Sequence, residues 1–303
     1  MSVRVSVVIP TYNRARDLRR ALASVLAQSF QDYEILIIDN HSDDDTAQVV
    51  ESFHDARLRL LSVHNHGVIA VSRNHGLAHA AGEYVAFLDS DDWWLPAKLE
   101  RCVRALDAGA DVVYHDLYLA RSASQRPRLR RAYTRQLRSP VLGDLLERGN
   151  ALVNSGVIVR RGVLEAAGGQ SEDPSIASIE DYECWLRLAR LTERFQRLDE
   201  VLGFYWLGGG NMTTPARTLR SLNHLRELYF VPQGRVREED LPGWYHYHLG
   251  RAHLKLGAYR EAVRHLRQAA SGTLTPAVRV RNLASRVYAR VRAGSSAAPG
   301  LTI

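Results

Sequence analysis

Three carboxylates within four residues are the strongest chemical feature of this sequence. Asp89, Asp91 and Asp92, with Ser90 between the first two, follow directly after the apolar segment EYVAFL. Like charges at this spacing raise one another's pKa unless a cation lies among them. Mg²⁺ and Mn²⁺ take oxygen ligands from one or two carboxylates and complete their shell with phosphate and water. The segment therefore indicates a site for a divalent cation and phosphates, with a plain capped turn as the structural alternative.

Three further polar clusters stand where an expected strand ends or a helix begins. The segment Pro10-Thr11-Tyr12-Asn13-Arg14 follows the first apolar run, Asp39 closes the second, and Glu180-Asp181 opens an amphipathic segment. An aromatic ring beside a hydroxyl can stack on a nucleobase and hydrogen-bond to it, and a carboxylate can accept a base N–H or a ribose hydroxyl. Each cluster also has a structural reading, because Pro and Asn favour turns and acids suit helix N-termini.

The elements that must position these clusters alternate along residues 1–116. Strands are expected at 3–9, 34–39, 58–63, 83–89 and 111–115, and helices at 16–28, 46–53, 72–81 and 96–109. This alternation is typical of a parallel α/β sheet. Such sheets bind ligands at the carboxyl ends of their strands, so we expect the clusters to meet at one edge.

The rest of the chain changes character twice. Residues 121–138 contain seven arginines and no acid, which predicts a basic loop near the site; 154–160 and 201–207 read as strands and 180–190 as a helix. From about residue 217 the chain is expected to be helical. Within residues 243–276, five positions have the spacing of one tetratricopeptide-like repeat: Leu249, Gly250, Ala262, Leu266 and Ala269. A single repeat cannot bury its own face, so we expect it to pack on neighbouring helices.

Composition excludes several classes of protein. Two cysteines without a C-x-x-C pair, in 303 residues, exclude a disulfide framework and a cysteine-rich zinc site. No apolar run approaches the roughly 18 residues that cross a bilayer. The start of the chain alternates like a strand rather than a signal peptide, so we expect a cytoplasmic protein. No G-x-G-x-x-G follows the first strand, which disfavours a dinucleotide oxidoreductase.

Charge is unevenly distributed. Residues 1–116 hold 11 Lys/Arg against 17 Asp/Glu, and residues 216–303 hold 15 against 5. Five arginines recur in an acid-free helical segment of this tail: Arg279, Arg281, Arg286, Arg290 and Arg292. We expect peripheral contact with an anionic membrane at its inner face, with a simply solvated basic face as the alternative. No nucleic-acid-binding motif is present, so no nucleic-acid partner is expected.

Taken together, the clusters resemble the family-2 glycosyltransferases with the GT-A fold, over roughly residues 3–213. The resemblance rests on VSVVIPTYNR (5–14), HNHGVIAVSRNHGLAHAAGEYVAFLDSDDW (64–93), NSGVIVRR (154–161), Gly168-Gly169 and EDYECWLRL (180–188). It implies an α/β fold with a Rossmann-like mixed central sheet flanked by helices, followed by a small all-α C-terminal region. Residues 1–116 would form the sugar-nucleotide half, 117–215 the acceptor half and 216–303 the helical region.

The resemblance also implies roles for individual residues. The nucleotide would be bound by Pro10, Thr11, Tyr12, Arg14, Asp39, Arg73, Asp89, Ser90 and Asp91. Within that set Asp89 would meet the ribose and Asp91 the metal, Mg²⁺ or Mn²⁺. Asp181 would be the general base. On the acceptor side we expect Trp93 to stack on a sugar, His115 to line the cleft because it closes a strand, and Glu180 to lie nearby.

The implied reaction is a metal-dependent, inverting transfer of a sugar from a nucleoside diphosphate, with a UDP-sugar expected first, to a hydroxyl of a saccharide or lipid-linked acceptor. Surface polysaccharide or glycoconjugate synthesis is the expected setting. A catalytically silent relative that binds a sugar nucleotide or a partner protein, and a nucleotidyltransferase, remain open alternatives. One departure from the family is visible. Relatives carry a basic, His-containing motif after the last strand, whereas residues 205–213 contain Asn211 and no histidine.

Overall fold

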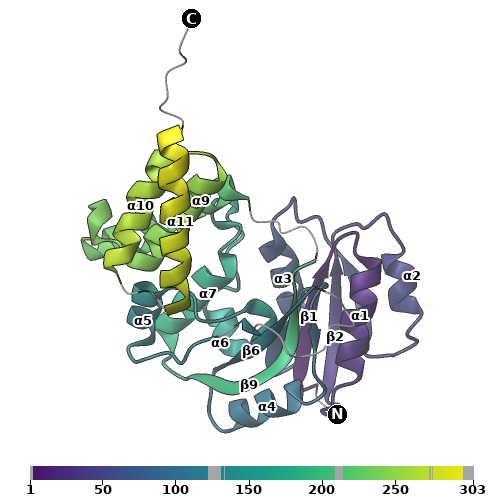
Figure 1. Ribbon diagram of the computed structural model, residues 1–303. Helices are drawn as coiled ribbons and strands as arrows, with labels where there is room; N and C mark the ends of the chain where they lie inside the picture. The colour runs from purple at the N-terminus through teal and green to yellow at the C-terminus, as the bar shows by residue number, and fades with distance from the viewer. Residues whose placement is uncertain are drawn as a thin grey trace, which may run out of the picture. The chain divides into compact units, whose positions relative to one another are not determined.

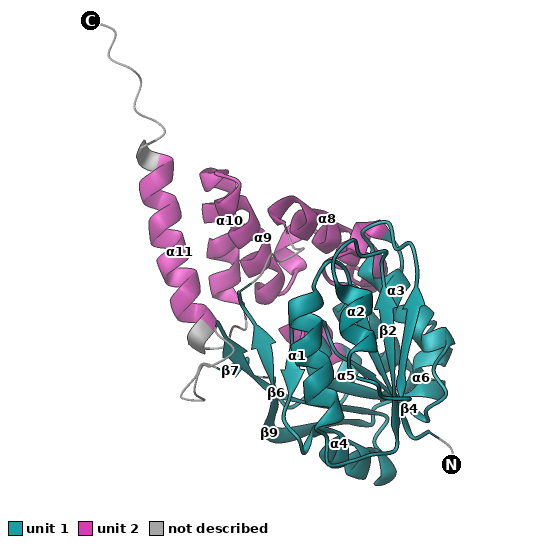
Figure 2. Ribbon diagram, turned by 90° about the vertical axis from the view of Figure 1, so that its right-hand side faces the viewer, with its two compact units in different colours: residues 1–142, 151–173, 180–210 teal, residues 143–150, 174–179, 211–303 magenta. Residues whose placement is uncertain are grey.

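The computed structural model describes residues 3–121, 131–132, 134–208, 214–272, 274 and 276–295. The chain forms two compact units (Figure 2). The first unit comprises residues 1–142, 151–173 and 180–210, and the second comprises 143–150, 174–179 and 211–303. Asn211 and most of the basic segment 121–138 lie outside the described residues.

The first unit is built on one sheet with the strand order β3-β2-β1-β4-β8-β6-β9-β5, and β7 pairs with β6. Figure 1 labels β1, β2, β6 and β9 of this sheet. The strands are β1 (Val5–Thr11), β2 (Tyr33–Asp39), β3 (Leu58–Ser62), β4 (Tyr84–Phe87), β5 (Trp93–Trp94), β6 (Val112–Ala120), β7 (Arg131–Ala132), β8 (Val157–Arg160) and β9 (Phe195–Trp206). Strands β1 to β4 are mutually parallel, and β8 runs antiparallel to both β4 and β6. The sheet is therefore mixed, as the resemblance implied, because β8 enters between β4 and β6.

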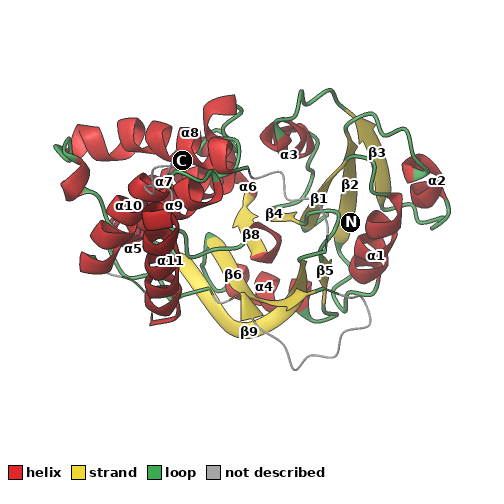
Figure 3. Cartoon of the chain, turned by 45° about the horizontal axis from the view of Figure 1, so that its top comes forward, coloured by secondary structure: helices red, strands yellow, loops and turns green. Residues whose placement is uncertain are grey.

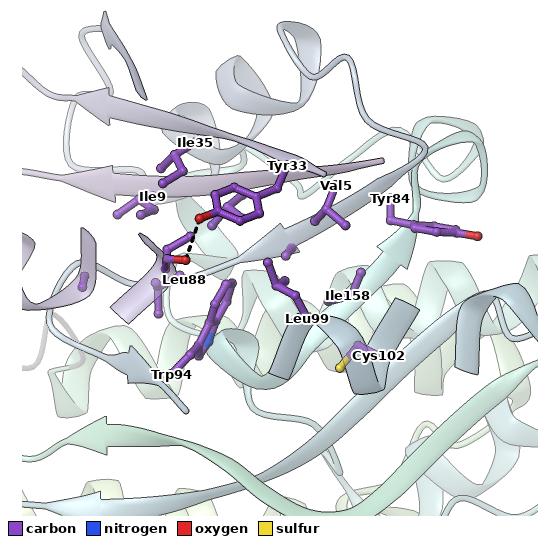
Figure 4. Close-up of a cluster of buried hydrophobic side chains, with 14 of the residues drawn as sticks. Val5, Ile9, Tyr33, Ile35, Tyr84, Leu88, Trp94, Leu99, Cys102 and Ile158 are labelled. Atoms are coloured by element: carbon purple, nitrogen blue, oxygen red, sulfur yellow. Dashed lines mark hydrogen bonds between the residues drawn. The ribbon is translucent and has the colours of Figure 1, made fainter. Parts of the chain in front are cut away.

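Helices flank this sheet (Figure 3). They are α1 (Ala15–Leu26), α2 (Thr46–Glu51), α3 (Ile69–Ala78), α4 (Lys98–Asp107), α6 (Arg161–Ala166) and α7 (Glu180–Leu191), with the 3₁₀ turn η1 (Asn154–Gly156). All seven residues of β1 are buried, which is usual for a parallel strand covered on both faces. The core on one face joins the sheet to α1, α2 and α4, with Trp94 and Leu99 among its members (Figure 4).

Helix α3 lies close against the sheet because Gly76 has no side chain at the point of contact. A Cβ at Gly76 would lie 2.4 Å from Cγ1 of Val8, which is closer than real Cβ atoms approach. The helix begins at Ile69, three residues before the expected start, because the turn at residues 65–68 closes earlier than the apolar spacing indicated. The close approach places the side chains of α3 beside the carboxyl ends of β1 and β4.

The second unit is helical among its described residues. It contains most of α5 (Val141–Arg148), then η2 (Pro174–Ile176), α8 (Pro215–Leu225), the π-helical turn η3 (Arg226–Phe230), η4 (Val231–Gln233), η5 (Glu238–Asp240), α9 (Gly243–Lys255), α10 (Tyr259–Ser271) and α11 (Pro276–Ser295). Helices α9 and α10 pack closely, since a Cβ at Gly250 would lie 2.6 Å from Cγ of Leu266. The expected helix–turn–helix is present; its assignment to the tetratricopeptide class stays a prediction.

Two segments differ from expectation. Strand β9 runs from Phe195 to Trp206, longer than the expected 201–207, because it pairs along β6 across two register shifts. The segment expected as a strand from residue 154 begins instead with η1, and only Val157–Arg160 is extended. Across the described part of the chain, no helix combines the length and apolar character that a bilayer crossing requires.

Candidate active site

The loop after β4 holds its carboxylates by contacts from both sides. The backbone N–H of Asp89 donates to Oγ of Ser155 at 3.1 Å, and Oδ1 of the buried Asp92 accepts from the backbone N–H of Trp206 at 2.8 Å. Asp91 is partly exposed, and its Oδ2 lies 3.1 Å from Nη1 of Arg14. Asp92 thus ties the loop to β9, while Asp89 and Asp91 remain near the surface.

Arg73 of α3 connects the two sequence regions that carry the acids. Its side chain is 4% exposed; Nη2 lies 2.7 Å from Oδ1 of Asp89 and Nη1 lies 3.1 Å from Oε1 of Glu180. Nη1 also donates to Oε1 of Gln170 at 2.9 Å. Burial alone would lower the pKa of Arg73. The charges of the two carboxylates outweigh burial and raise this pKa above its ordinary value, so the guanidinium stays charged. One buried cation therefore holds the strand-end acid and the first turn of α7 together.

An amide network that the sequence did not reveal supports this arginine. Asn74 Nδ2 donates to the carbonyl oxygen of Gln170 at 2.7 Å, and the N–H of Gln170 donates to Asn74 Oδ1 at 2.8 Å. Gln170 Nε2 donates to Asn154 Oδ1 at 3.3 Å, and Asn154 Nδ2 donates to Oδ1 of Asp89 at 3.4 Å. Gly169 has φ +67, and a Cβ there would lie 2.4 Å from Asn74 Oδ1. The Gly168-Gly169 pair before a glutamine was the available signal.

Asp181 lies beside Glu180 in the first turn of α7 and is partly buried. Its Oδ1 accepts from the backbone N–H of Tyr182 at 2.6 Å. Burial is the largest influence and the Glu180 carboxylate the next; together they raise the pKa of Asp181 well above its ordinary value, against the opposing charge of Arg73. A partly buried carboxylate with a raised pKa is suited to taking a proton near neutral pH.

Tyr205 of β9 is under the electrostatic influence of acids from both sequence regions. Burial, followed by the charges of Asp92, Asp89, Asp91 and Asp181 in that order, raises the pKa of the Tyr205 hydroxyl. Electrostatic influence of this kind weakens with distance. Acids of the loop after β4 and of the first turn of α7 therefore act on the same tyrosine, although they are some ninety residues apart in sequence.

Several of the proposed nucleotide residues lie at or near the carboxyl ends of β1 and β2. Thr11 and Asp39 are paired in the sheet register, and Ser42 donates to Asp39 through its N–H and its hydroxyl. Thr11 is 4% exposed, and its Oγ1 has no hydrogen-bond partner among the described residues. Tyr12 is 53% exposed. A buried free hydroxyl beside an exposed ring suits recognition of a planar polar ligand. Pro10 and Ser90, the other two candidates, are buried.

The acceptor candidates separate by burial. Trp93 is partly buried, stacks on Phe204 at 4.7 Å between ring centroids, and lies under the guanidinium of Arg20. Trp94 belongs to the core, whereas the expected stacking of Trp93 on a sugar stays a prediction. His115 is 0% exposed, and its Nδ1 contacts the backbone oxygen of Asp116. We therefore withdraw the expectation that His115 lines the cleft, because β6 runs on past it to Ala120 inside the sheet.

The donor set around Asp91 fits a divalent cation that brings its own ligands. Burial, and then the neighbouring charge of Asp89, raises the pKa of Asp91 to about 6. That shift marks surplus negative charge around Asp91, which the guanidinium of Arg14 offsets in part. No group of three or more His, Cys, Asp or Glu is arranged to hold a metal within the described ranges. One partly exposed carboxylate suits Mg²⁺ or Mn²⁺ whose remaining ligands are phosphate oxygens and water.

The mixed sheet and its flanking helices are those of the GT-A fold. Residues 6–166 match the family described as "Glycosyl transferase family 2". This match covers more than half of the chain, and the protein belongs to that family.

Individual relatives agree with this assignment. An uncharacterized glycosyltransferase of Nostoc sp. is 33% identical over 69% of this chain and 66% of its own length. The Escherichia coli enzyme UDP-Glc:alpha-D-GlcNAc-diphosphoundecaprenol beta-1,3-glucosyltransferase WfgD is 40% identical over 32% of this chain and 38% of its own. The alignments thus span less than two thirds of either relative.

Solved structures share the fold. Staphylococcus aureus TarS 1-349 in complex with UDP-GlcNAc superposes with a TM-score of 0.62 at 20% identity, covering 95% of this chain and 88% of that one. The mannosyltransferase PcManGT from Pyrobaculum calidifontis, in complex with GDP-Man and Mn²⁺, gives 0.56 at 22% identity, covering 96% and 84%.

Proposed function

We propose that this glycosyltransferase is metal-dependent and inverting. It moves a sugar from a nucleoside-diphosphate sugar, with a UDP-sugar as the first candidate, to a hydroxyl of a saccharide or lipid-linked acceptor. The TarS and PcManGT structures were obtained with UDP-GlcNAc and with GDP-Man and Mn²⁺, which supports a nucleotide-sugar donor and a divalent cation. The name of WfgD describes a diphosphoundecaprenol-linked acceptor, and TuaG of Bacillus subtilis is named for teichuronic acid biosynthesis. Both support a role in surface-glycan synthesis.

The observation that carries the proposal is the single buried Arg73 between Asp89 and Glu180. Asp89 belongs to the strand end that would receive the donor, and Glu180 precedes Asp181 on α7. A shared cation sets the distance between the donor carboxylates and the candidate base. A fixed arrangement of this kind raises the rate of the chemical step, because reacting groups must lie within about 3–3.5 Å of each other.

Each residue then has a defined task. Tyr12 would stack on the base, Thr11 and Asp39 would hydrogen-bond the base and ribose, and Asp91 would hold the cation. A bound divalent cation supplies positive charge that stabilises the departing diphosphate. Asp181 would take the proton of the acceptor hydroxyl during attack. One base opposite the leaving group gives a single displacement and inversion at the anomeric carbon, unlike the two-carboxylate pattern of a retaining glycosidase.

Calorimetry and a transfer assay on the full chain test the proposal. We expect UDP to bind more tightly with Mn²⁺ than with EDTA, and a screen of UDP-, GDP- and dTDP-sugars against extracted lipid-linked and free saccharides to yield product of inverted configuration. Nucleotide binding without transfer for any pair would favour a catalytically silent relative. Release of pyrophosphate would favour a nucleotidyltransferase, and product with retained configuration would overturn the role of Asp181.

A further inference from the structure

Helix α11 has the reverse of the usual amphipathic arrangement. Its buried positions are Asn282, Ser285 and Ala289, which are small or polar. Asn282 Nδ2 donates to the carbonyl oxygen of Leu266 on α10 at 3.0 Å, and Arg251 of α9 donates to Oγ of Ser285 at 3.0 Å. Hydrogen bonds and small side chains therefore attach α11 to the helix pair at these three positions, and Val278 near the start of the helix is the one large apolar residue of α11 described as partly buried.

Those large residues lie on the outer side. Five side chains of α11 are between 53% and 70% exposed: Val280, Leu283, Val287, Tyr288 and Val291. With 3.6 residues per turn, Val280, Leu283 and Val287 form one stripe along the helix, whereas a surface helix normally turns such a stripe toward its own core. Contacts run from α8 to α9, α9 to α10 and α10 to α11, and Figure 2 shows α11 as the outermost helix of that row.

Arginines border the stripe on both sides. The helical repeat places Arg279, Arg286 and Arg290 along one edge, and Arg281 and Arg292 along the other. The helix contains no acid. Long basic side chains at the edges of an apolar face can extend their charged ends away from it, which suits a surface that is apolar below and anionic above.

Charge decides which occupant fits this face. A second copy of the chain would bring two sets of arginines together around the stripe, and like charges in contact cost several kcal/mol. Anionic headgroups instead attract each Arg near the surface by about 1 kcal/mol, while the acyl boundary takes up the apolar side chains. We propose that α11 lies in the plane of an anionic membrane, with its stripe among the acyl chains and its arginines among the headgroups.

The proposal depends on the proposed function in one respect: membrane binding would bring the enzyme to an acceptor anchored in that membrane. The binding face itself lies within the second unit, whereas every proposed catalytic residue lies within the first. Membrane binding and sugar transfer are therefore measured separately, and failure of one does not imply failure of the other.

Co-sedimentation of the full chain with vesicles tests the proposal. We expect binding to vesicles of phosphatidylcholine with phosphatidylglycerol and at least tenfold less to phosphatidylcholine alone. The double variant Leu283→Asp/Val287→Asp should lose at least tenfold in partitioning, because two apolar side chains no longer enter the bilayer. Leu256→Asp and Val236→Asp are matched controls, since these residues are 52% and 57% exposed elsewhere in the second unit; they should bind as the wild type does.

A fluorophore reports insertion directly. Both native cysteines are buried, so Val287→Cys can be labelled selectively. An environment-sensitive dye there should shift to shorter wavelength on anionic vesicles, while the same dye at Leu256→Cys should not. Equal binding to both vesicle types, an unchanged double variant, or a wild-type dimer that the double variant dissociates would each overturn the proposal. UDP affinity of the double variant should equal that of the wild type; loss of that affinity would also count against it.

Discussion

The guanidinium of Arg73 lies 2.7 Å from the carboxylate of Asp89, and the two groups are joined within the first unit beneath the candidate site. The arginine is almost fully buried, while the carboxylate keeps 28% of its side-chain exposure. The pair therefore has a supporting side inside the protein and an open side toward solvent. A ligand that approaches Asp89 meets an acid whose position is already fixed.

Replacement of Arg73 should destabilise the fold as well as the site. Arg73→Ala leaves Asp89 and Glu180 without their shared cation, and breaking a buried pair in this way typically costs about 3–5 kcal/mol. Urea unfolding measures the change in the free energy of unfolding. Arg101→Ala is the control, because Arg101 is 45% exposed and lies 3.7 Å from Glu200, and it should cost at most about 1 kcal/mol. Equal effects of the two variants would refute the structural role of Arg73.

Asp181→Asn should separate binding from catalysis. The amide keeps the shape of the side chain but cannot take a proton, so we expect UDP affinity within twofold of the wild type and kcat lower by about 10²–10⁴. Calorimetry and initial rates with a saturating donor give the two values. Asp199→Asn, at a side chain 86% exposed on β9, should leave both unchanged. A kcat for Asp181→Asn within tenfold of the wild type would exclude it as the base.

The strand-end part of the site followed from the sequence because parallel strands share one edge. Thr11, Asp39 and Asp89 each end or follow an apolar strand, and β1 is the neighbour of both β2 and β4. The supporting network did not follow. Gln170 and Asn154 act through amide contacts set by a glycine at φ +67 and by a 3₁₀ turn, which no hydrophobic period encodes.

His115 shows the opposite error. Its position after an apolar run indicated a strand end, but β6 continues to Ala120, so His115 is buried within the strand. Pattern reasoning locates a strand without fixing its last residue, and polar residues such as His115 and Asp116 can extend a strand when partners on a neighbouring strand, here β9, are available. The pairing partners are separated by many residues in sequence, so local spacing could not reveal them.

The rate should depend on pH through Asp181. Its pKa is raised, and a general base must be ionised, so kcat/KM should fall as pH decreases through that pKa and level off above it. Glu180→Gln removes the neighbouring negative charge and leaves Arg73 free to act on Asp181. The acid limb should therefore move to lower pH in this variant. A profile between pH 5 and pH 9 with an unmoved limb would contradict the coupling of the two acids.

Asp91→Ala should remove the metal dependence of donor binding. Without this carboxylate the cation lacks its protein ligand, so we expect UDP to bind at least tenfold more weakly with Mn²⁺ and equally with and without the metal. Asp17→Asn is a matched control, because its side chain is as exposed as that of Asp91 and lies 3.5 Å from the same Arg14. A variant at Asp91 that still responds to Mn²⁺ would place the metal elsewhere.

The buried Lys98 predicts a pH-dependent stability. Its side chain is 0% exposed, Nζ lies 3.6 Å from the ring centroid of Trp94, and Nζ has no hydrogen-bond partner in the described part of the chain. Burial lowers the pKa of Lys98 to about 7 from its ordinary value of 10.5. Between these values the unfolded chain binds more protons than the folded one, so the free energy of unfolding should rise with pH across this window.

Lys98→Met removes that titration while filling most of the same space. We expect the variant to be more stable than the wild type by a few kcal/mol near pH 7, since each unit of lowered pKa corresponds to about 1.4 kcal/mol. The cation–π contact with Trp94 stabilises the charged amine and reduces this difference. The difference should shrink toward zero as pH approaches 10, because the neutral amine has no burial penalty of that kind. Urea titrations at several pH values measure it. A gap between variant and wild type that stays constant with pH would show that Lys98 is not forced toward neutrality, and a variant less stable at every pH would show that the cation–π contact outweighs the burial of the charge.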